Sequence, residues 1–99
     1  MPFESRRVGY EFEWDPRKAE ENLRKHGVSF EEACTVFADP LAMLTADPDH
    51  SAEEQRYILL GMSKRGSLLV VAFGERPPRT RLISARRAIR RERREYEEG

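Results

Sequence analysis

Three β-favouring runs in the second half of the chain place the strongest constraint on its fold. They span residues 56–62, 67–73 and 79–84. The connections between them contain Lys64-Arg65-Gly66 and Glu75-Arg76-Pro77-Pro78, which are short enough for hairpins. The runs therefore predict an antiparallel meander.

Two helices are predicted in the first half of the chain. Asp15-Pro16 is a strong helix start, because Asp can cap free backbone N–H groups and Pro at the first helical position has no N–H that needs a partner. This helix is expected to end at about His26. Ser29 and Glu32 have the spacing of a capping box, which predicts a second helix that ends before Asp39-Pro40.

The remaining elements are shorter or lie at the ends of the chain. Aromatic side chains alternate with glutamates over residues 10–14, which predicts a half-buried strand, and residues 41–45 are compatible with another. Residues 46–51 are polar and are expected to form an exposed turn. Ser84 is expected to cap a C-terminal helix. Residues 1–9 show no periodicity and are expected to be a flexible extension.

Together these elements predict an α+β fold in which two N-terminal helices and a C-terminal helix pack on an antiparallel β-sheet. A chain of 99 residues with 38% hydrophobic residues has room for one modest core, so residues 10–99 are expected to form a single domain. Cys34 is the only cysteine and lies on the apolar side of the second helix, so we assign it to the core.

The chain shows no sign of secretion or of membrane insertion. Its N-terminus lacks the apolar stretch of a secretory signal, and no run approaches the length of about 18 apolar residues expected of a membrane-spanning helix. A single cysteine allows no intrachain disulfide. The reducing cytoplasm is therefore the expected compartment.

The formal net charge of zero hides an uneven distribution of charge. Residues 76–99 hold nine Arg and four Glu, whereas residues 1–75 hold nine basic and fourteen acidic residues, so the two parts carry about +5 and −5. Most of these Arg fall in the predicted C-terminal helix. Two interpretations are equally good: closely spaced guanidinium groups bind the phosphates of a nucleic acid, or the interleaved Glu make this a solvated, salt-bridged helix.

The second hairpin carries one group of candidate catalytic residues. Glu75-Arg76 ends the most apolar strand and Arg79 and Arg81 follow the turn, so a carboxylate and several guanidinium groups are expected on one sheet face or rim. Metal-independent RNA cleavage needs a group that takes the 2'-hydroxyl proton, a group that protonates the leaving 5' oxygen, and positive charge on the phosphorane. These residue types supply all three, although a turn decorated with surface charges is the simpler interpretation.

A second candidate group ends the first predicted helix, where Lys25 and His26 stand side by side. His transfers protons near neutral pH, but basic residues in the last turn of a helix are ordinary and a lone His more often has a structural role. No His or Cys spacing suits zinc and no Gly-rich loop opens a helix. We therefore expect no metal and no cofactor.

Several motifs, in a consistent order over about residues 12–96, resemble the BrnT family of ribonuclease toxins. The motifs of the first half are Phe12-Glu13-Trp14-Asp15, Asn22-Leu23-Arg24-Lys25-His26-Gly27-Val28-Ser29-Phe30-Glu31-Glu32-Ala33 and Asp39-Pro40-Leu41. Those of the second half are Arg56-Tyr57-Ile58-Leu59-Leu60-Gly61, residues 68–71, Glu75-Arg76, Arg81-Leu82-Ile83-Ser84-Ala85-Arg86 and Arg91-Glu92-Arg93. The chain departs from the family pattern at Phe73-Gly74 and at Pro77-Pro78, beside the candidate hairpin.

The resemblance implies a compact fold similar to RelE-type toxins, a ribonuclease activity that arrests translation, and a BrnA-type antitoxin as partner. In such systems the antitoxin is the main DNA-binding component, so this chain would contact DNA mainly through that partner.

The resulting hypothesis is a metal-independent endoribonuclease. Glu75 or His26 is expected to transfer protons, Arg76 and Arg81 to stabilise the phosphorane, and Lys25 with Arg86 to hold the RNA backbone. The alternative is a non-catalytic interaction module that binds an antitoxin-like acidic protein segment or a nucleic acid through its Arg-rich C-terminal helix. Only the first hypothesis predicts turnover.

Overall fold

The computed structural model describes residues 11–47 and 54–99, so the predicted extension over 1–9 and residues 48–51 of the predicted turn lie outside the described residues. The elements, in chain order, are β2 (Glu11–Glu13), α1 (Pro16–His26), α2 (Phe30–Thr35), the short 3-10 helix η1 (Val36–Ala38), β3 (Met43–Ala46), β4 (Gln55–Met62), β5 (Leu68–Arg76), β6 (Arg79–Arg87) and α3 (Arg90–Glu98). Across the described ranges, no helix is long and apolar enough to cross a membrane.

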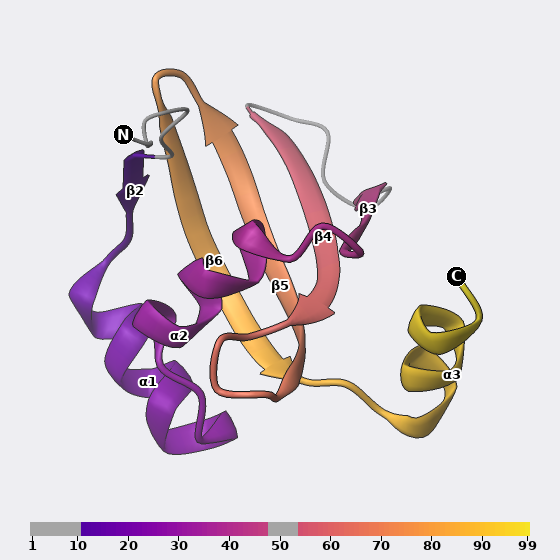
Figure 1. Ribbon diagram of the computed structural model, residues 1–99. Helices are drawn as coiled ribbons and strands as arrows, with labels where there is room; N and C mark the ends of the chain where they lie inside the picture. The colour runs from indigo at the N-terminus through magenta and orange to yellow at the C-terminus, as the bar shows by residue number, and fades with distance from the viewer. Residues whose placement is uncertain (1–10, 48–53) are drawn as a thin grey trace.

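The strands form one five-stranded sheet in the order β2-β6-β5-β4-β3 (Figure 1). The pairs β3–β4, β4–β5 and β5–β6 are antiparallel, which confirms the predicted meander. The prediction of an entirely antiparallel sheet is wrong at one edge, because β2 runs parallel to β6. Short connections determine strand direction only within hairpins, and β2 and β6 are separated by nearly the whole chain.

The starts of α1 and α2 agree with the predicted capping chemistry. An Asp15 carboxylate oxygen accepts a hydrogen bond from the backbone N–H of Arg17 at 2.9 Å, and the Ser29 hydroxyl accepts one from the N–H of Glu32 at 3.0 Å. α1 ends at Gly27, whose φ of 71° is in the left-handed region that glycine adopts without strain. The Glu32 carboxylate leaves the expected capping box and accepts a hydrogen bond from the Ser63 hydroxyl at 2.7 Å, which ties α2 to the β4–β5 connection.

The predicted start of the C-terminal helix at Ser84 is wrong. β6 continues to Arg87, and Ser84 pairs with Ala72 of β5. A register irregularity lies next to this pair, between Ala72 and Phe73. The continued pairing buries the next residue, Ala85, completely, so the sheet outcompetes a local helix cap there. α3 begins instead after Ile89, whose N–H donates to the Glu92 carboxylate at 2.9 Å.

The sheet has two different faces, which we name from the alternation of side chains along β5. The helix-covered face, on the side of Val71 and Phe73, packs against α1 and α2. Its buried core consists of Val28, Phe30, Ala33, Val36, Leu59, Leu69, Val71, Phe73, Leu82 and Ala85. The open face, on the side of Val70 and Gly74, carries a smaller buried cluster of Leu60, Leu68 and Val70, which Tyr96 of α3 partly covers.

Cys34 packs at the margin of the main core, as the sequence predicted. Burial and the neighbouring Glu31 carboxylate raise the pKa of its thiol to about 11. A thiol with so high a pKa is almost entirely protonated at neutral pH, and it is therefore a packing residue and a poor nucleophile.

One buried amide joins the helical layer to the sheet. The Asn22 side chain of α1 donates to the Val28 carbonyl at 2.9 Å and to the Ala85 carbonyl at 2.7 Å, and its oxygen accepts from the Ala85 N–H at 3.0 Å. Asn22 is only 6% exposed, so water cannot easily replace these partners. This amide therefore sets the position of α1 against β6.

We predict that Asn22→Ala lowers the free energy of unfolding by about 1–3 kcal/mol, because it leaves buried backbone groups at Val28 and Ala85 without partners. Urea unfolding followed by circular dichroism measures the loss. The matched control is Glu21→Ala, one residue earlier in α1 and exposed, which should change the stability by less than about 0.5 kcal/mol. Equal stabilities of the two variants would contradict a bridging role for Asn22.

Candidate functional site

The end of the open face nearest the β5–β6 hairpin holds a cluster of charged side chains. Arg56 of β4 pairs with Gly74 of β5, and Gly74 pairs with Arg81 of β6. Directly paired residues project to the same side of a sheet, so both arginines lie on the open face with glycine between them. The space above Gly74 is therefore available to another group.

The Glu54 carboxylate fills this space. Its oxygens lie 3.6 Å from Arg56 Nε, 3.8 Å from Arg81 Nη1 and 3.9 Å from Arg76 Nε. A Cβ atom at Gly74 would stand 2.6 Å from Glu54 Oε2, closer than non-bonded atoms can approach, so this placement depends on glycine.

A second carboxylate borders the same group of arginines. Glu13 of β2 lies 3.4 Å from Arg76 Nη1 and 4.0 Å from Arg79 Nε. We call the whole set the arginine cluster; it consists of Arg56, Arg76, Arg79 and Arg81 with Glu13 and Glu54. Four guanidinium groups against two carboxylates leave the cluster with a formal charge of about +2.

The ion pairs of the arginine cluster are loose. Their distances of 3.4–4.0 Å exceed the roughly 2.7–2.9 Å of a charge-assisted hydrogen bond. The pair between Arg86 and Glu92 is different, because two guanidinium nitrogens of Arg86 donate to the two carboxylate oxygens at 2.9 and 2.8 Å. The Glu92 hydrogen bonds raise the pKa of Arg86, and those same bonds lower the pKa of Glu92 against the opposing effect of burial.

The structure brings only some of the candidate residues together. Arg76 and Arg81 both contact Glu54 on the open face. Glu75 lies between Gln55 and Thr80 in the pairing, and alternation along β5 directs it to the side of Phe73, away from Gly74 and Arg76. The prediction that these side chains share one sheet face is therefore right for the arginines and wrong for Glu75, which is half-buried at the rim.

Lys25 and His26 lie in another part of the molecule. They are exposed at the end of α1, on the helix-covered side of the sheet. α1 is bonded to β6 at Ala85, which is about 13 Å along the strand from Arg81. Figure 1 shows α1 at the far end of β6 from the β5–β6 hairpin. Arg86 is also near that end, but on the open face, where it is engaged with Glu92.

Sequence analysis missed Glu54 and Arg56. Glu54 precedes β4, and its relevance depends on the register that places Arg56 opposite Gly74. The glycine itself is the signal that could have drawn attention to this position, because a strand glycine often marks a close approach by another group.

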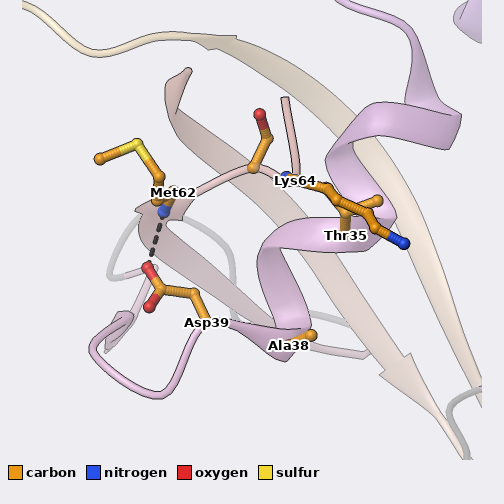
Figure 2. A pocket seen from close by; sticks show the side chains of 6 residues that line it. Thr35, Ala38, Asp39, Met62 and Lys64 are labelled. Carbon is orange, nitrogen blue, oxygen red and sulfur yellow. Dashed lines mark hydrogen bonds between the residues drawn. The ribbon is translucent and has the colours of Figure 1, made fainter. Parts of the chain in front are cut away.

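A pocket of about 430 Å³ lies elsewhere, lined by Thr35, Ala38, Asp39, Met62, Ser63 and Lys64 (Figure 2). Figure 2 shows the Asp39 carboxylate directed at the backbone N–H of Met62, which donates to it at 2.7 Å. The carboxylate also accepts from the Leu41 N–H at 2.9 Å and from the Tyr96 hydroxyl at 2.7 Å. With three donors bound, Asp39 forms a structural joint between η1, β4 and α3.

The hydrogen bonds at this joint shift the pKa values of both acidic partners. Burial raises the pKa of Asp39, but the bonds from Met62, Leu41 and Tyr96 outweigh it and the net pKa is lowered. The bond to Asp39 is the main cause that raises the pKa of the Tyr96 hydroxyl, with burial and the Asp39 charge adding to it. The joint is thus formed between a carboxylate and a neutral phenol.

The described part of the chain contains no group of three or more His, Cys, Asp or Glu residues arranged to hold a metal ion. The groups that meet in the arginine cluster are guanidinium and carboxylate groups. Loosely paired guanidinium groups on an exposed sheet face can bind an oxyanion such as a phosphate.

Comparison with known proteins identifies a matching family and a similar solved structure. The profile of a family described as "Ribonuclease toxin, BrnT, of type II toxin-antitoxin system" matches residues 14–92. A 1.1 Å crystal structure of the ribonuclease toxin BrnT from Brucella abortus is similar to this chain, with a TM-score of 0.61 and 21% sequence identity, and the match covers 83% of this chain and 100% of that one. At this identity the likeness supports the fold. A search of curated proteins gives no significant match.

We predict that acid loosens α3 from the sheet. The folded-state pKa values of Asp39 and Glu92 are lowered from their ordinary values of 3.8 and 4.5. A lowered pKa means that the stabilisation is present above the ordinary pKa and is lost as the pH falls through the folded value. The amide resonances of residues 90–98 should therefore shift as the pH falls below about 4.

The double variant Asp39→Asn with Glu92→Gln is the control for this titration. It lacks both carboxylates, so the acid-induced shifts of residues 90–98 between about pH 5 and 2 should be clearly smaller than in the parent. An acid transition of equal size in the parent and the double variant would assign the effect to other groups.

Proposed function

Since the chain belongs to the BrnT family of ribonuclease toxins of type II toxin–antitoxin systems, we propose that it is a metal-independent endoribonuclease that binds RNA on the open face of its sheet. The observation that carries this proposal is the convergence of the Arg76 and Arg81 guanidinium groups on one carboxylate at the exposed hairpin end of that face. The family match supports the ribonuclease class, and the arginine cluster supports the location.

The proposed chemistry is attack of the RNA 2'-hydroxyl on the adjacent phosphorus. Negative charge develops on the phosphorane, and Arg76 and Arg81 would stabilise it. Both arginines are held in place by neighbouring strands, β5 and β6, which a two-residue turn connects. The leaving 5' oxygen takes a proton and the fragment ends in a 2',3'-cyclic phosphate.

Proton transfer is assigned to Glu75 or His26. Glu75 adjoins Arg76 in the same hairpin, but its side chain is directed to the helix-covered side, so it would have to reach RNA around the hairpin rim; His26 is exposed at the other end of the sheet. Contacts of Lys25 and Arg86 with the RNA backbone stay a prediction. Arg86 would have to release Glu92 to donate both of its bonds to RNA.

The biological role follows from the family. A type II system pairs the toxin with a protein antitoxin, and we propose that the antitoxin here is of the BrnA type, that the fold is RelE-like, and that RNA cleavage inhibits translation in the cytoplasm. DNA contact would pass through the antitoxin complex. These are proposals supported by the family match and by the similarity to the Brucella toxin fold.

The test is incubation of the purified protein with total RNA in EDTA, beside the variant Arg76→Ala with Arg81→Ala. We expect the parent to yield fragments ending in cyclic or 3'-phosphate, and the double variant to be slower by about 10²-fold or more, because the charge on the phosphorane is no longer compensated. The matched control is Arg17→Ala with Lys18→Ala, which removes two exposed charges from the start of α1 and should retain activity.

Single variants then identify the group that transfers protons. Either Glu75→Gln or His26→Gln should lose most of the activity, and the residual activity should lack one limb of the pH–rate profile. Such a result would assign proton transfer to the substituted residue. Intact RNA with the parent protein, together with salt-sensitive RNA binding, would favour the non-catalytic interaction module instead. Equal cleavage by the parent and the Arg76, Arg81 variant would remove the hairpin from the mechanism.

A further inference from the structure

We propose that Arg56, Arg76 and Arg81 form a binding site for one phosphate group of the RNA backbone, and that the Glu54 carboxylate occupies this site as an internal anion when RNA is absent. The identity of the ligand rests on the proposed function. The site itself rests on the arrangement of these four side chains and on the glycine below them.

Three strands or strand ends contribute one cationic group each. Arg56 comes from the start of β4, Arg76 from the end of β5 and Arg81 from the start of β6, and all three approach within 4.0 Å of the same carboxylate. An anion held by three guanidinium groups from separate strands has a position fixed by the sheet. Arg56 is thus a third phosphate-binding residue beside Arg76 and Arg81.

A carboxylate and a phosphate bind to these arginines through the same kind of hydrogen bond. Guanidinium groups present planar pairs of N–H donors that match two oxygens of either anion. Glu54 does not satisfy those donors closely, because its distances of 3.6–3.9 Å are about 1 Å longer than in the Arg86–Glu92 pair. A backbone phosphate can therefore form shorter bonds than the ones it replaces.

Gly74 leaves the space that the Glu54 carboxylate occupies. A Cβ atom there would meet Glu54 Oε2 at 2.6 Å and Cδ at 2.8 Å, so any larger residue must displace the carboxylate. The Glu54 side chain is only 16% exposed, which shows that it lies down against the sheet between the arginines. A phosphate that enters between the arginines would have to displace this carboxylate against its attraction to them.

This arrangement predicts opposite effects for two neighbouring substitutions. Glu54→Gln keeps the shape but removes the internal negative charge, so RNA should bind about three- to tenfold more tightly. Arg56→Ala removes a phosphate contact, so binding should weaken by about three- to tenfold. If Glu54 served only to hold the arginines in place, both substitutions would weaken binding.

The probe is a fluorescein-labelled 2'-O-methyl RNA oligonucleotide, which cannot be cleaved because it lacks the attacking hydroxyl. Fluorescence anisotropy at one fixed salt concentration gives its Kd for the parent, Glu54→Gln, Arg56→Ala and the control Arg17→Ala. Arg17 is exposed on the helix-covered side, so its variant should bind within about twofold of the parent. Inorganic phosphate is added as competitor, and weak competition at millimolar concentrations would show that the site needs the polymer.

The outcomes decide both parts of the proposal. Unchanged or weaker binding by Glu54→Gln would overturn the internal anion, and undiminished binding by Arg56→Ala would remove that residue from the site. Unfolding curves establish that each variant is folded. A measurement on the parent needs no variant: the Nε–Hε resonances of Arg56, Arg76 and Arg81 should shift together on addition of the oligonucleotide, and unmoved resonances would overturn the site.

This experiment is separate from the cleavage assay. If total RNA stays intact but the Kd values change in the predicted directions, the ribonuclease proposal fails and the phosphate site stands. If RNA is cleaved but Glu54→Gln and Arg56→Ala bind like the parent, the activity stands and the phosphate site fails.

Discussion

The hydrogen bonds between Asn22 and Ala85 hold the two layers of the molecule together. Ala85 lies in β6, and β6 is the strand that pairs with both β2 and β5 and carries Arg81 near its start. An amide that donates to one residue of a strand and also accepts from it specifies the position of the helix along that strand. Apolar packing alone specifies this position less sharply. This contact therefore positions α1 against β6, while the pairing of β4, β5 and β6 places the arginines.

The open face is divided into two halves by the way α3 is attached. Bonds from Arg86 to Glu92 and from Tyr96 to Asp39 hold α3 beside the apolar cluster around Leu60 and Val70. The hairpin end of the same face carries the arginine cluster. α1 and α2 lie on the other face of the sheet (Figure 1). A surface that packs a helix at one end and displays guanidinium groups at the other combines stability and anion binding on one sheet.

Local patterns predicted much of the fold, and long-range pairing explains what they could not. Asp15 and Ser29 cap their helices as expected, because capping needs only neighbouring residues. The direction of β2 and the extension of β6 past Ser84 depend on partners distant in sequence, so periodicity had no information about them. The same limit applies to the site: Arg76 and Arg81 were visible beside one turn, whereas Glu54 and Arg56 join them only through the β4–β5 register.

The uneven charge of the sequence has a structural explanation that also bears on function. The acidic first part of the chain supplies Glu13 and Glu54, and the basic last part supplies Arg76, Arg79 and Arg81, so some of the opposite charge is paired internally. This pairing is incomplete, because Arg56 adds a fourth guanidinium group to the two carboxylates. The nitrogen–oxygen distances are also longer than in the Arg86–Glu92 pair. A chain with no net charge therefore retains a local positive site. Neutral composition sets the average field of the whole molecule, whereas binding of a phosphate depends on the few groups within a Debye length of it.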